Sequence, residues 1–233
     1  RRMVCRKLIA AAFVVFSAAP VAAQDNLLYL TTEAGEDRLL GAELNRDYFS
    51  LASYLEYEQV LTFCGPASVS AVANSLNIDR PSPDRLYPWT LFTQDLLFNA
   101  ANQKLKPYGM VEHEGLTLAE LDQFIENLGL AADHHFADET SVDELREMIQ
   151  TTLSDRDARL IVNYSRQALP QTGDGHISPI GAYDADTDSV LILDVAKYKY
   201  PPVWISIQKL HDGMMMIDSG SSRSRGFVQV SLQ

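Results

Sequence analysis

Cysteine is nearly absent from this chain of 233 residues, which has only Cys5 and Cys64. Cys5 lies in the leader described below, so Cys64 is the only cysteine expected in the mature protein, and an intramolecular disulfide is excluded. A lone thiol outside the cytoplasm is open to oxidation unless a function requires it. This scarcity favours a functional role for Cys64 over the alternative of a small buried hydrophobe.

Positive charge and long apolar runs are scarce as well. The chain carries 19 Lys and Arg against 31 Asp and Glu, a formal net charge of −12. So acidic a protein is a poor partner for nucleic acid, because phosphate binding needs clustered Lys and Arg. Beyond residue 23 no stretch is long and apolar enough to span a bilayer, so we expect no transmembrane anchor.

The first 23 residues have the three parts of a secretory signal peptide. A basic start contains Arg1, Arg2, Arg6 and Lys7, residues 8–16 form an apolar core, and small residues precede a cleavage site after Ala23. This segment has four basic residues and no acidic one, so the remainder has a formal charge of −16. The sequence predicts a signal peptide over 1–23, one domain over 24–233, and export to a bacterial periplasm.

Hydrophobic periodicity divides the rest of the chain into a helical part and a stranded part. Helices are predicted over residues 36–46, 66–76 and 91–101, and two capping boxes, Thr117 with Glu120 and Ser141 with Glu144, open helices that end near residues 128 and 153. Strands are predicted over residues 26–31, 159–165, 176–183, 189–196, 204–207 and 226–232. Helices followed by a mostly antiparallel sheet are an α+β layout.

Cys64 comes just before a run of small and apolar residues that begins at Pro66. Proline suits the first turn of a helix, where its missing N–H would have no partner. The unpaired N–H groups and the positive end of the helix dipole stabilise a thiolate, which is the reactive form of cysteine. We therefore expect Cys64 to be a nucleophile at a helix N-terminus.

A cysteine nucleophile needs a base and a third group that orients the base. Among five histidines, His176 is best placed, because it follows the glycine-bearing loop 171–175 and opens a strand. Asp194 lies in the next strand, inside an apolar run where a carboxylate needs a partner. If the turn is centred on Asp186, the side chains of His176 and Asp194 lie on the same face of the sheet. A centre half a residue away would put them on opposite faces unless a β-bulge shifts the register back. Pro179 favours an irregularity of this kind in the strand pairing. A strand-edge histidine and a structural carboxylate remain the alternatives.

Other candidate sites are weaker. The adjacent His134 and His135 would point to opposite sides of a strand, which disfavours a shared metal ion. Residues 214–216, three methionines, fit core packing better than soft-metal binding. The aspartates of residues 184–188 lack the EF-hand pattern and indicate a solvated turn, and His113 lies between two glutamates in a solvated loop. We predict no metal ligand.

Several stretches resemble the phytochelatin synthase family. They are Phe63-Cys-Gly-Pro-Ala-Ser, Gln171-Thr-Gly-Asp-Gly-His-Ile-Ser-Pro-Ile-Gly-Ala-Tyr, Leu191-Ile-Leu-Asp-Val-Ala-Lys-Tyr-Lys-Tyr-Pro-Pro-Val-Trp, Met216-Ile-Asp and Arg225-Gly-Phe. The resemblance covers most of residues 50–232 and implies a papain-like α+β fold. It implies Cys64 as the acylated nucleophile, His176 as the base and Asp194 as the orienting carboxylate. Gly175, Lys197 and Tyr200 are expected to bind substrate.

The resemblance also implies glutathione as the substrate. In the family, the thiolate attacks the carbonyl between cysteine and glycine, glycine leaves, and the γ-glutamylcysteinyl group passes to a second glutathione or to water. Eukaryotic members add a cysteine-rich domain tied to heavy-metal response, whereas short bacterial members resemble hydrolases, so we expect mainly hydrolysis to γ-glutamylcysteine. No cofactor is expected, and heavy-metal ions would enter only as thiolate complexes of the substrate. The sequence is compatible with a homodimer.

One position departs from the family pattern. The family usually has glutamine six positions before the cysteine, where its amide helps to bind the oxyanion; here that residue is Glu58, followed by Gln59. A carboxylate would repel the developing negative charge. Either Gln59 serves through a loop shorter by one residue, which we expect, or the oxyanion hole is impaired. The backbone N–H of Cys64 is the second donor in both cases.

Two other functions stay open on the sequence. The chain is also compatible with a papain-like peptidase or amidase acting on another thiol peptide. A catalytically silent protein that binds thiols or soft metals is the third reading.

Overall fold

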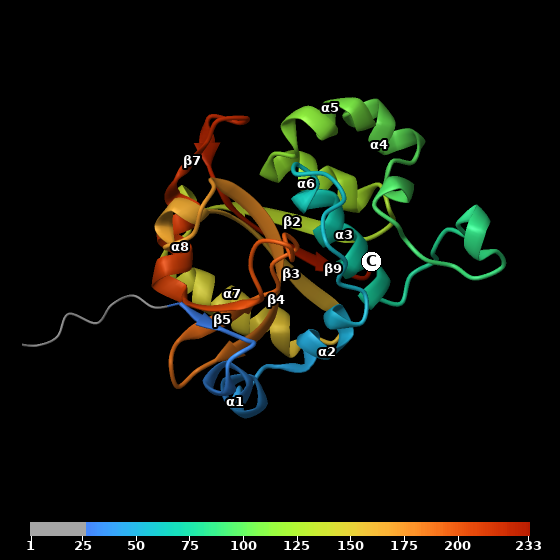
Figure 1. The fold of residues 1–233 in the computed structure, drawn as a ribbon. Helices are drawn as coiled ribbons and strands as arrows, with labels where there is room; N and C mark the ends of the chain where they lie inside the picture. Colours follow the sequence, from blue (N-terminus) through green and yellow to red (C-terminus); the bar gives the residue numbers. More distant parts are fainter. Residues whose placement is uncertain (1–26) are drawn as a thin grey trace, which may run out of the picture.

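A computed structural model describes residues 27–233, so the predicted signal peptide lies outside the described residues. Seven strands form one antiparallel sheet in the order β1-β6-β5-β4-β3-β9-β2, and β7 and β8 form a small separate ribbon (Figure 1). The predicted α+β layout is confirmed. Within residues 27–233 no helix has both the length and the apolar character needed to cross a membrane.

Residues 27–233 contain nine strands and eight α-helices. The strands are β1 (Leu28–Tyr29), β2 (Ala131–Phe136), β3 (Ala158–Ser165), β4 (Gly175–Asp184), β5 (Ser189–Ile192), β6 (Val203–Ser206), β7 (Ile217–Asp218), β8 (Arg223–Ser224) and β9 (Gly226–Ser231). The helices are α1 (Glu33–Gly41), α2 (Arg46–Ala52), α3 (Cys64–Ser75), α4 (Ala100–Leu105), α5 (Tyr108–Glu114), α6 (Leu118–Glu126), α7 (Val142–Ser154) and α8 (Ile207–Met215).

The sheet is buried on both faces because its strands alternate between two cores. In β3, Ile161 joins the core formed with α3 and α6, whereas Leu160 and Val162 join the core formed with α7 and α8. Figure 1 shows these helix pairs on opposite sides of the strands. The near-continuous apolar run of β3 follows from this double burial.

The pairing register of the β4–β5 hairpin decides whether His176 and Asp194 lie on the same face of the sheet. Next to the turn, Tyr183 pairs with Val190. This pairing centres the turn half a residue beyond Asp186, the predicted centre. A bulge between Ile180 and Ala182 shifts the register, so that Ile180 pairs with Ile192, as the predicted phase requires. An extra residue in one strand changes which side chains share a face, so this bulge keeps the ends of the two strands in phase.

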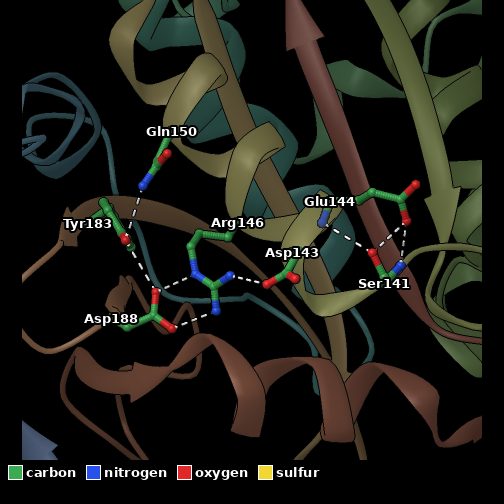
Figure 2. Close-up of polar contacts among 7 residues, drawn as sticks. All are labelled: Ser141, Asp143, Glu144, Arg146, Gln150, Tyr183 and Asp188. Atoms are coloured by element: carbon green, nitrogen blue, oxygen red, sulfur yellow. Dashed lines mark hydrogen bonds and ion pairs between the residues drawn. The ribbon is translucent and has the colours of Figure 1, made fainter.

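The acidic turn of this hairpin is fastened to α7. Arg146 donates to both carboxylate oxygens of Asp188, at 2.8 and 2.9 Å, and the Tyr183 hydroxyl donates to the same carboxylate (Figure 2). At the start of α7, the predicted capping box of Ser141 and Glu144 is present (Figure 2). The turn is therefore held by an arginine rather than only solvated.

Several helix predictions were wrong in their bounds. Residues 36–46 do not form one helix: Thr32 caps α1, and Asn45 precedes α2. Residues 91–99 form a loop with one 3-10 turn. The Asn74 side chain donates to the Phe92 carbonyl and accepts from the Phe92 backbone N–H, and these two bonds fix the loop. The strand β2 and the helix α8 were not predicted, since the apolar residues of α8 are separated by the polar ones of its exposed face.

Replacing Gly226 with alanine should destabilise the sheet. A Cβ at Gly226 would lie 1.9 Å from the carbonyl oxygen of His135 on the paired strand β2, so the backbone must move. We expect a loss of about 3 kcal/mol, which lowers Tm by about 6–12 °C for a domain of this size. Thermal unfolding measures the loss, and Gly109→Ala is the matched control because a Cβ there meets open space. Equal Tm values for the two variants would contradict the prediction.

Candidate active site

Cys64 is the first residue of α3, as predicted, and Phe63 is the N-cap. The Phe63 ring is fully buried and packs against the rings of Phe98 and Tyr108, at centroid distances of 5.8 and 5.1 Å. The Ser68 hydroxyl, one turn along α3, lies within hydrogen-bond distance of the Cys64 and Ile177 carbonyl oxygens. The aromatic cluster and this hydroxyl fix the cysteine against β4.

His176 and Asp194 form the second part of the site. The ring nitrogen Nε2 of His176 lies 2.8 Å from Oδ1 of Asp194, and both side chains are buried. Asp194 also accepts from the backbone N–H of Ala196 at 2.8 Å. With Nε2 bonded to the carboxylate, Nδ1 is the nitrogen left to accept a proton. The predicted contact between His176 and Asp194 is therefore present.

Arg166 supplies the positive charge that the buried carboxylate needs. Its guanidinium nitrogens lie 2.8 and 2.9 Å from the two Asp194 oxygens, and its side chain is 3% exposed. Burial alone would raise the pKa of Asp194, but the contacts with His176 and Arg166 outweigh it and lower the pKa to about 2. Asp194 is therefore ionised at every pH at which the protein is expected to work.

The sulfur and the imidazole meet where α3 reaches β4. Sγ of Cys64, a ring nitrogen of His176 and a carboxylate oxygen of Glu58 all lie within 4.8 Å of one another. A proton can pass from the thiol to the imidazole over this separation as the substrate closes in, because such contacts tighten when substrate binds. The three atoms lie close enough together to bind one metal ion. A nucleophile and its base would also lie this close, so we assign no metal ligand here.

The thiol of Cys64 is protonated at rest, contrary to the expected thiolate. Burial, together with the negative charge of Glu58, raises the pKa of Cys64 to about 12. The backbone N–H groups of Ile177 and Gly65 and the charge of Arg166 act in the other direction but do not compensate. The helix N-terminus is thus outweighed by desolvation, so a nucleophilic role for Cys64 would require a base that removes the proton during attack.

A cavity of about 200 Å³ opens beside the sulfur. Its lining comes from the loop before α3, the end of α5, the strands β3 and β4 and the β7 ribbon: Leu61, Thr62, Cys64, Glu114, Gly115, Leu116, Asn163, Asp174, Gly175, His176, Ile177, Asp218, Ser219 and Arg225. The lining contains one guanidinium and several carboxylates. Such a lining suits a small ligand with charges of both signs.

Arg225 holds the positive charge of this cavity. It is 5% exposed, lies 3.6 and 3.8 Å from the carboxylates of Asp174 and Asp218, and donates to Oδ1 of Asn163 at 3.2 Å. A Cβ at Gly175 would lie 2.4 Å from the Arg225 guanidinium, so glycine is what allows the arginine to lie against β4. Gly175, predicted to bind substrate, does line the cavity and shapes it in this way.

Glu58, and not Gln59, faces the sulfur. Glu58 is 5% exposed, its backbone N–H donates to the Val195 carbonyl at 2.9 Å, and the Tyr198 hydroxyl bonds its carboxylate. Gln59 is exposed and lines a different surface pocket. Buried Gln94 bonds the backbone on both sides of Glu58, so the loop is fixed in this phase. The expected use of Gln59 in the oxyanion hole does not fit this geometry.

Lys197 and Tyr200 lie outside the cavity that holds Cys64. The ammonium of Lys197 donates to the Leu55 carbonyl at 3.0 Å. The Tyr200 ring lies under the Arg166 guanidinium, and its hydroxyl accepts from the backbone N–H of Thr172 at 2.7 Å. Both residues thus contact the loops that carry the site. Neither lines the cavity beside Cys64, where a residue that binds substrate was predicted.

The sequence analysis missed Arg166, Arg225 and Asp218 as members of the site. A signal for Arg166 existed, because a carboxylate inside an apolar run needs a positive partner, and a neutral histidine does not supply one. Arg225 and Asp218 stood in stretches that carried the family resemblance, but nothing in their spacing placed them beside Cys64. Long-range packing brings them there.

Comparison with known proteins identifies the family of the chain. The sequence model of the phytochelatin synthase family matches residues 19–227. Over 186 residues the chain is 36% identical to glutathione gamma-glutamylcysteinyltransferase 2 of Arabidopsis thaliana, a match that covers 79% of this chain and 39% of that protein. It is 37% identical over 184 residues to glutathione gamma-glutamylcysteinyltransferase 1 of Triticum aestivum, covering 79% of this chain and 36% of that protein.

The chain therefore spans well under half the length of these relatives. Among solved structures, the peptidase domain of Streptococcus ComA aligns over 77% of this chain and 99% of that domain, with 15% identity and a TM-score of 0.45. The family match extends over most of the chain and includes the cysteine, the histidine and the aspartate assembled above. The chain belongs to the phytochelatin synthase family.

Proposed function

We propose that this chain cleaves glycine from glutathione through a thioester on Cys64. The observation that carries the proposal is the Cys64–His176–Asp194 set, which borders a small cavity with charges of both signs. The names of the relatives point to the same transferred group, γ-glutamylcysteinyl. The sequence, the side-chain geometry and the relatives all favour a cysteine acyltransferase.

The reaction follows from the positions of the groups. Nδ1 of His176 takes the Cys64 proton while the sulfur attacks the carbonyl carbon of the substrate's cysteine residue. The C–N bond to glycine breaks, and His176 returns the proton to the leaving amine. Water, deprotonated by His176, then attacks the thioester and releases γ-glutamylcysteine, whereas attack by the amine of a second glutathione gives phytochelatin. We keep water as the main acceptor, as the sequence suggested.

The charges in the cavity suit the γ-glutamyl end of glutathione. That end carries an α-carboxylate and an α-ammonium on one carbon, and Arg225 and Asp218 offer the opposite charges side by side. The Arg225 contacts with carboxylates, at 3.6 and 3.8 Å, are longer than direct hydrogen bonds, so the guanidinium is available for a substrate carboxylate.

Incubation with glutathione tests the proposal. We expect release of free glycine and a protein mass increased by one γ-glutamylcysteinyl group on Cys64. A tripeptide of the same composition but with an α-linked glutamate is the control, and it should be cleaved far more slowly. Equal cleavage of both would favour an ordinary peptidase, and binding without glycine release or adduct would favour a silent thiol-binding protein.

Replacing Arg225 with glutamine should weaken substrate binding more than turnover. Loss of a charge-assisted contact is worth about 1.5–3 kcal/mol, so we expect kcat/KM for glutathione to fall about 10- to 100-fold, mainly through KM. Arg223→Gln is the matched control, since that half-buried arginine pairs with Glu139 outside the cavity. Steady-state kinetics measure both variants, and an unchanged KM for Arg225→Gln would contradict the assignment.

A further inference from the structure

Glu58 is a buried carboxyl group beside the nucleophile that the mechanism above does not use. It is 5% exposed, and one of its oxygens lies within 4.8 Å of both Sγ of Cys64 and a ring nitrogen of His176. Oε1 is bonded to the Tyr198 hydroxyl, whereas Oε2 is buried without a hydrogen-bond partner. A buried polar atom without a partner, next to a reacting centre, calls for an explanation.

An ionised Glu58 does not fit its neighbours during the reaction. Attack by the sulfur on the carbonyl places negative charge on an oxygen between the groups that surround Cys64. A carboxylate there accepts hydrogen bonds but donates none, and it repels that charge in a site from which water is largely excluded. A neutral carboxylic acid, in contrast, has one O–H to donate.

We propose that Glu58 acts as a neutral carboxylic acid whose free oxygen donates a hydrogen bond to the oxyanion, together with the backbone N–H of Cys64. The inference rests on the proposed function, because it concerns the tetrahedral intermediate of that reaction. The Tyr198 hydroxyl donates to Oε1, which leaves the proton on Oε2, the unpartnered oxygen. This proton stays on Glu58 throughout, since His176 carries the one that moves from sulfur to glycine.

The surroundings of Glu58 favour its neutral form. Burial raises the pKa of Glu58, and the negative charge of Asp194 acts in the same direction. The Tyr198 hydrogen bond and the charges of His176 and Arg166 oppose this without reversing it. The neutral form also helps the nucleophile, since the Glu58 charge is one cause of the raised pKa of Cys64. Activity should therefore fall as pH rises and Glu58 ionises.

The test compares the pH profiles of kcat/KM for glycine release by the wild type, Glu58→Gln and Glu58→Ala between pH 5 and 9. An amide donates at every pH, so the ratio of Glu58→Gln to wild type should be near one at pH 5 and rise about tenfold per pH unit above the pKa of Glu58. Titration of glutathione affects both proteins and cancels in the ratio. Glu58→Ala should be slower by about 10²- to 10³-fold at pH 5.

Two further measurements keep the outcomes separate. Glu56→Gln, an exposed glutamate on the same loop, should match the wild type at every pH. Infrared spectra should show a carboxylic-acid band that is absent from Glu58→Gln and fades with rising pH, and this readout needs no glutathione. A constant ratio, or a Glu58→Ala variant as fast as the wild type, overturns the role of Glu58 alone. Absence of glycine release by the wild type overturns the proposed function, and the role of Glu58 with it.

Discussion

Replacing Cys64 with serine is expected to reduce glycine release from glutathione by at least about 10⁴-fold. The hydroxyl is a far weaker nucleophile than the thiol, and the burial that raises the pKa of Cys64 would also disfavour an alkoxide. Product analysis after long incubation with high enzyme concentration measures the residual rate. Mass spectrometry should show the acyl adduct on the wild type and none on the variant.

The serine variant should keep its fold, because the substitution exchanges one atom for a smaller one at a partly exposed position. Its Tm should stay close to that of the wild type. Ser70→Ala, on the same helix and away from the cavity, is the matched control and should cleave glutathione at the wild-type rate. Undiminished glycine release from Cys64→Ser would remove the nucleophile assignment.

Replacing Asp194 with leucine should cost both activity and stability, for separate reasons. Activity should fall about 10²- to 10⁴-fold because His176 loses the group that fixes its orientation. Stability should fall by about 3–5 kcal/mol because the Arg166 charge is left buried without an opposing charge. Steady-state kinetics and urea unfolding measure the two losses.

Adding Arg166→Met to Asp194→Leu separates these two effects. The double variant has no uncompensated buried charge and should regain most of the lost stability, while its activity stays low. Recovery of activity with stability would show that Asp194 acts only as a structural carboxylate.

Acid unfolding provides a second difference between the double variant and the wild type. The pKa of Asp194 is depressed from its ordinary value near 4 to about 2, so its contribution is present above pH 4 and is lost as the pH falls from about 4 to 2. The wild type should therefore lose stability in this range more steeply than the double variant. Parallel acid-unfolding curves would contradict the ion pair.

The sequence predicted the helix start at Cys64 and the contact between His176 and Asp194 better than it predicted the bounds of the helices. Cys64 could be placed because Pro66 and the small residues after it indicate one helix start, a local signal. Whether His176 and Asp194 lie on the same face depended on the register of the hairpin to within half a residue. The bulge between Ile180 and Ala182 sets that register. Pro179 had suggested an irregularity, but its position and size are set by packing of the whole sheet.

Buried charges were the part that the sequence did not reveal. The position of Glu58 beside the sulfur depends on buried Gln94, which holds the loop from a point more than thirty residues further along the chain. The raised pKa of Cys64 likewise reflects desolvation of the sulfur by the surrounding fold, which outweighs the helix dipole. Such effects follow from tertiary burial, and no local motif encodes them.

The protonated state of Cys64 has a consequence for the protein between turnovers. Peroxides and electrophiles react with thiolates far faster than with thiols, so a sulfur that stays protonated reacts slowly with them. In the proposed mechanism the sulfur becomes reactive only when His176 takes its proton. The burial that raises the pKa of Cys64 thus also protects its sulfur when no substrate is bound. Cys64 is the only cysteine in the sequence after Cys5.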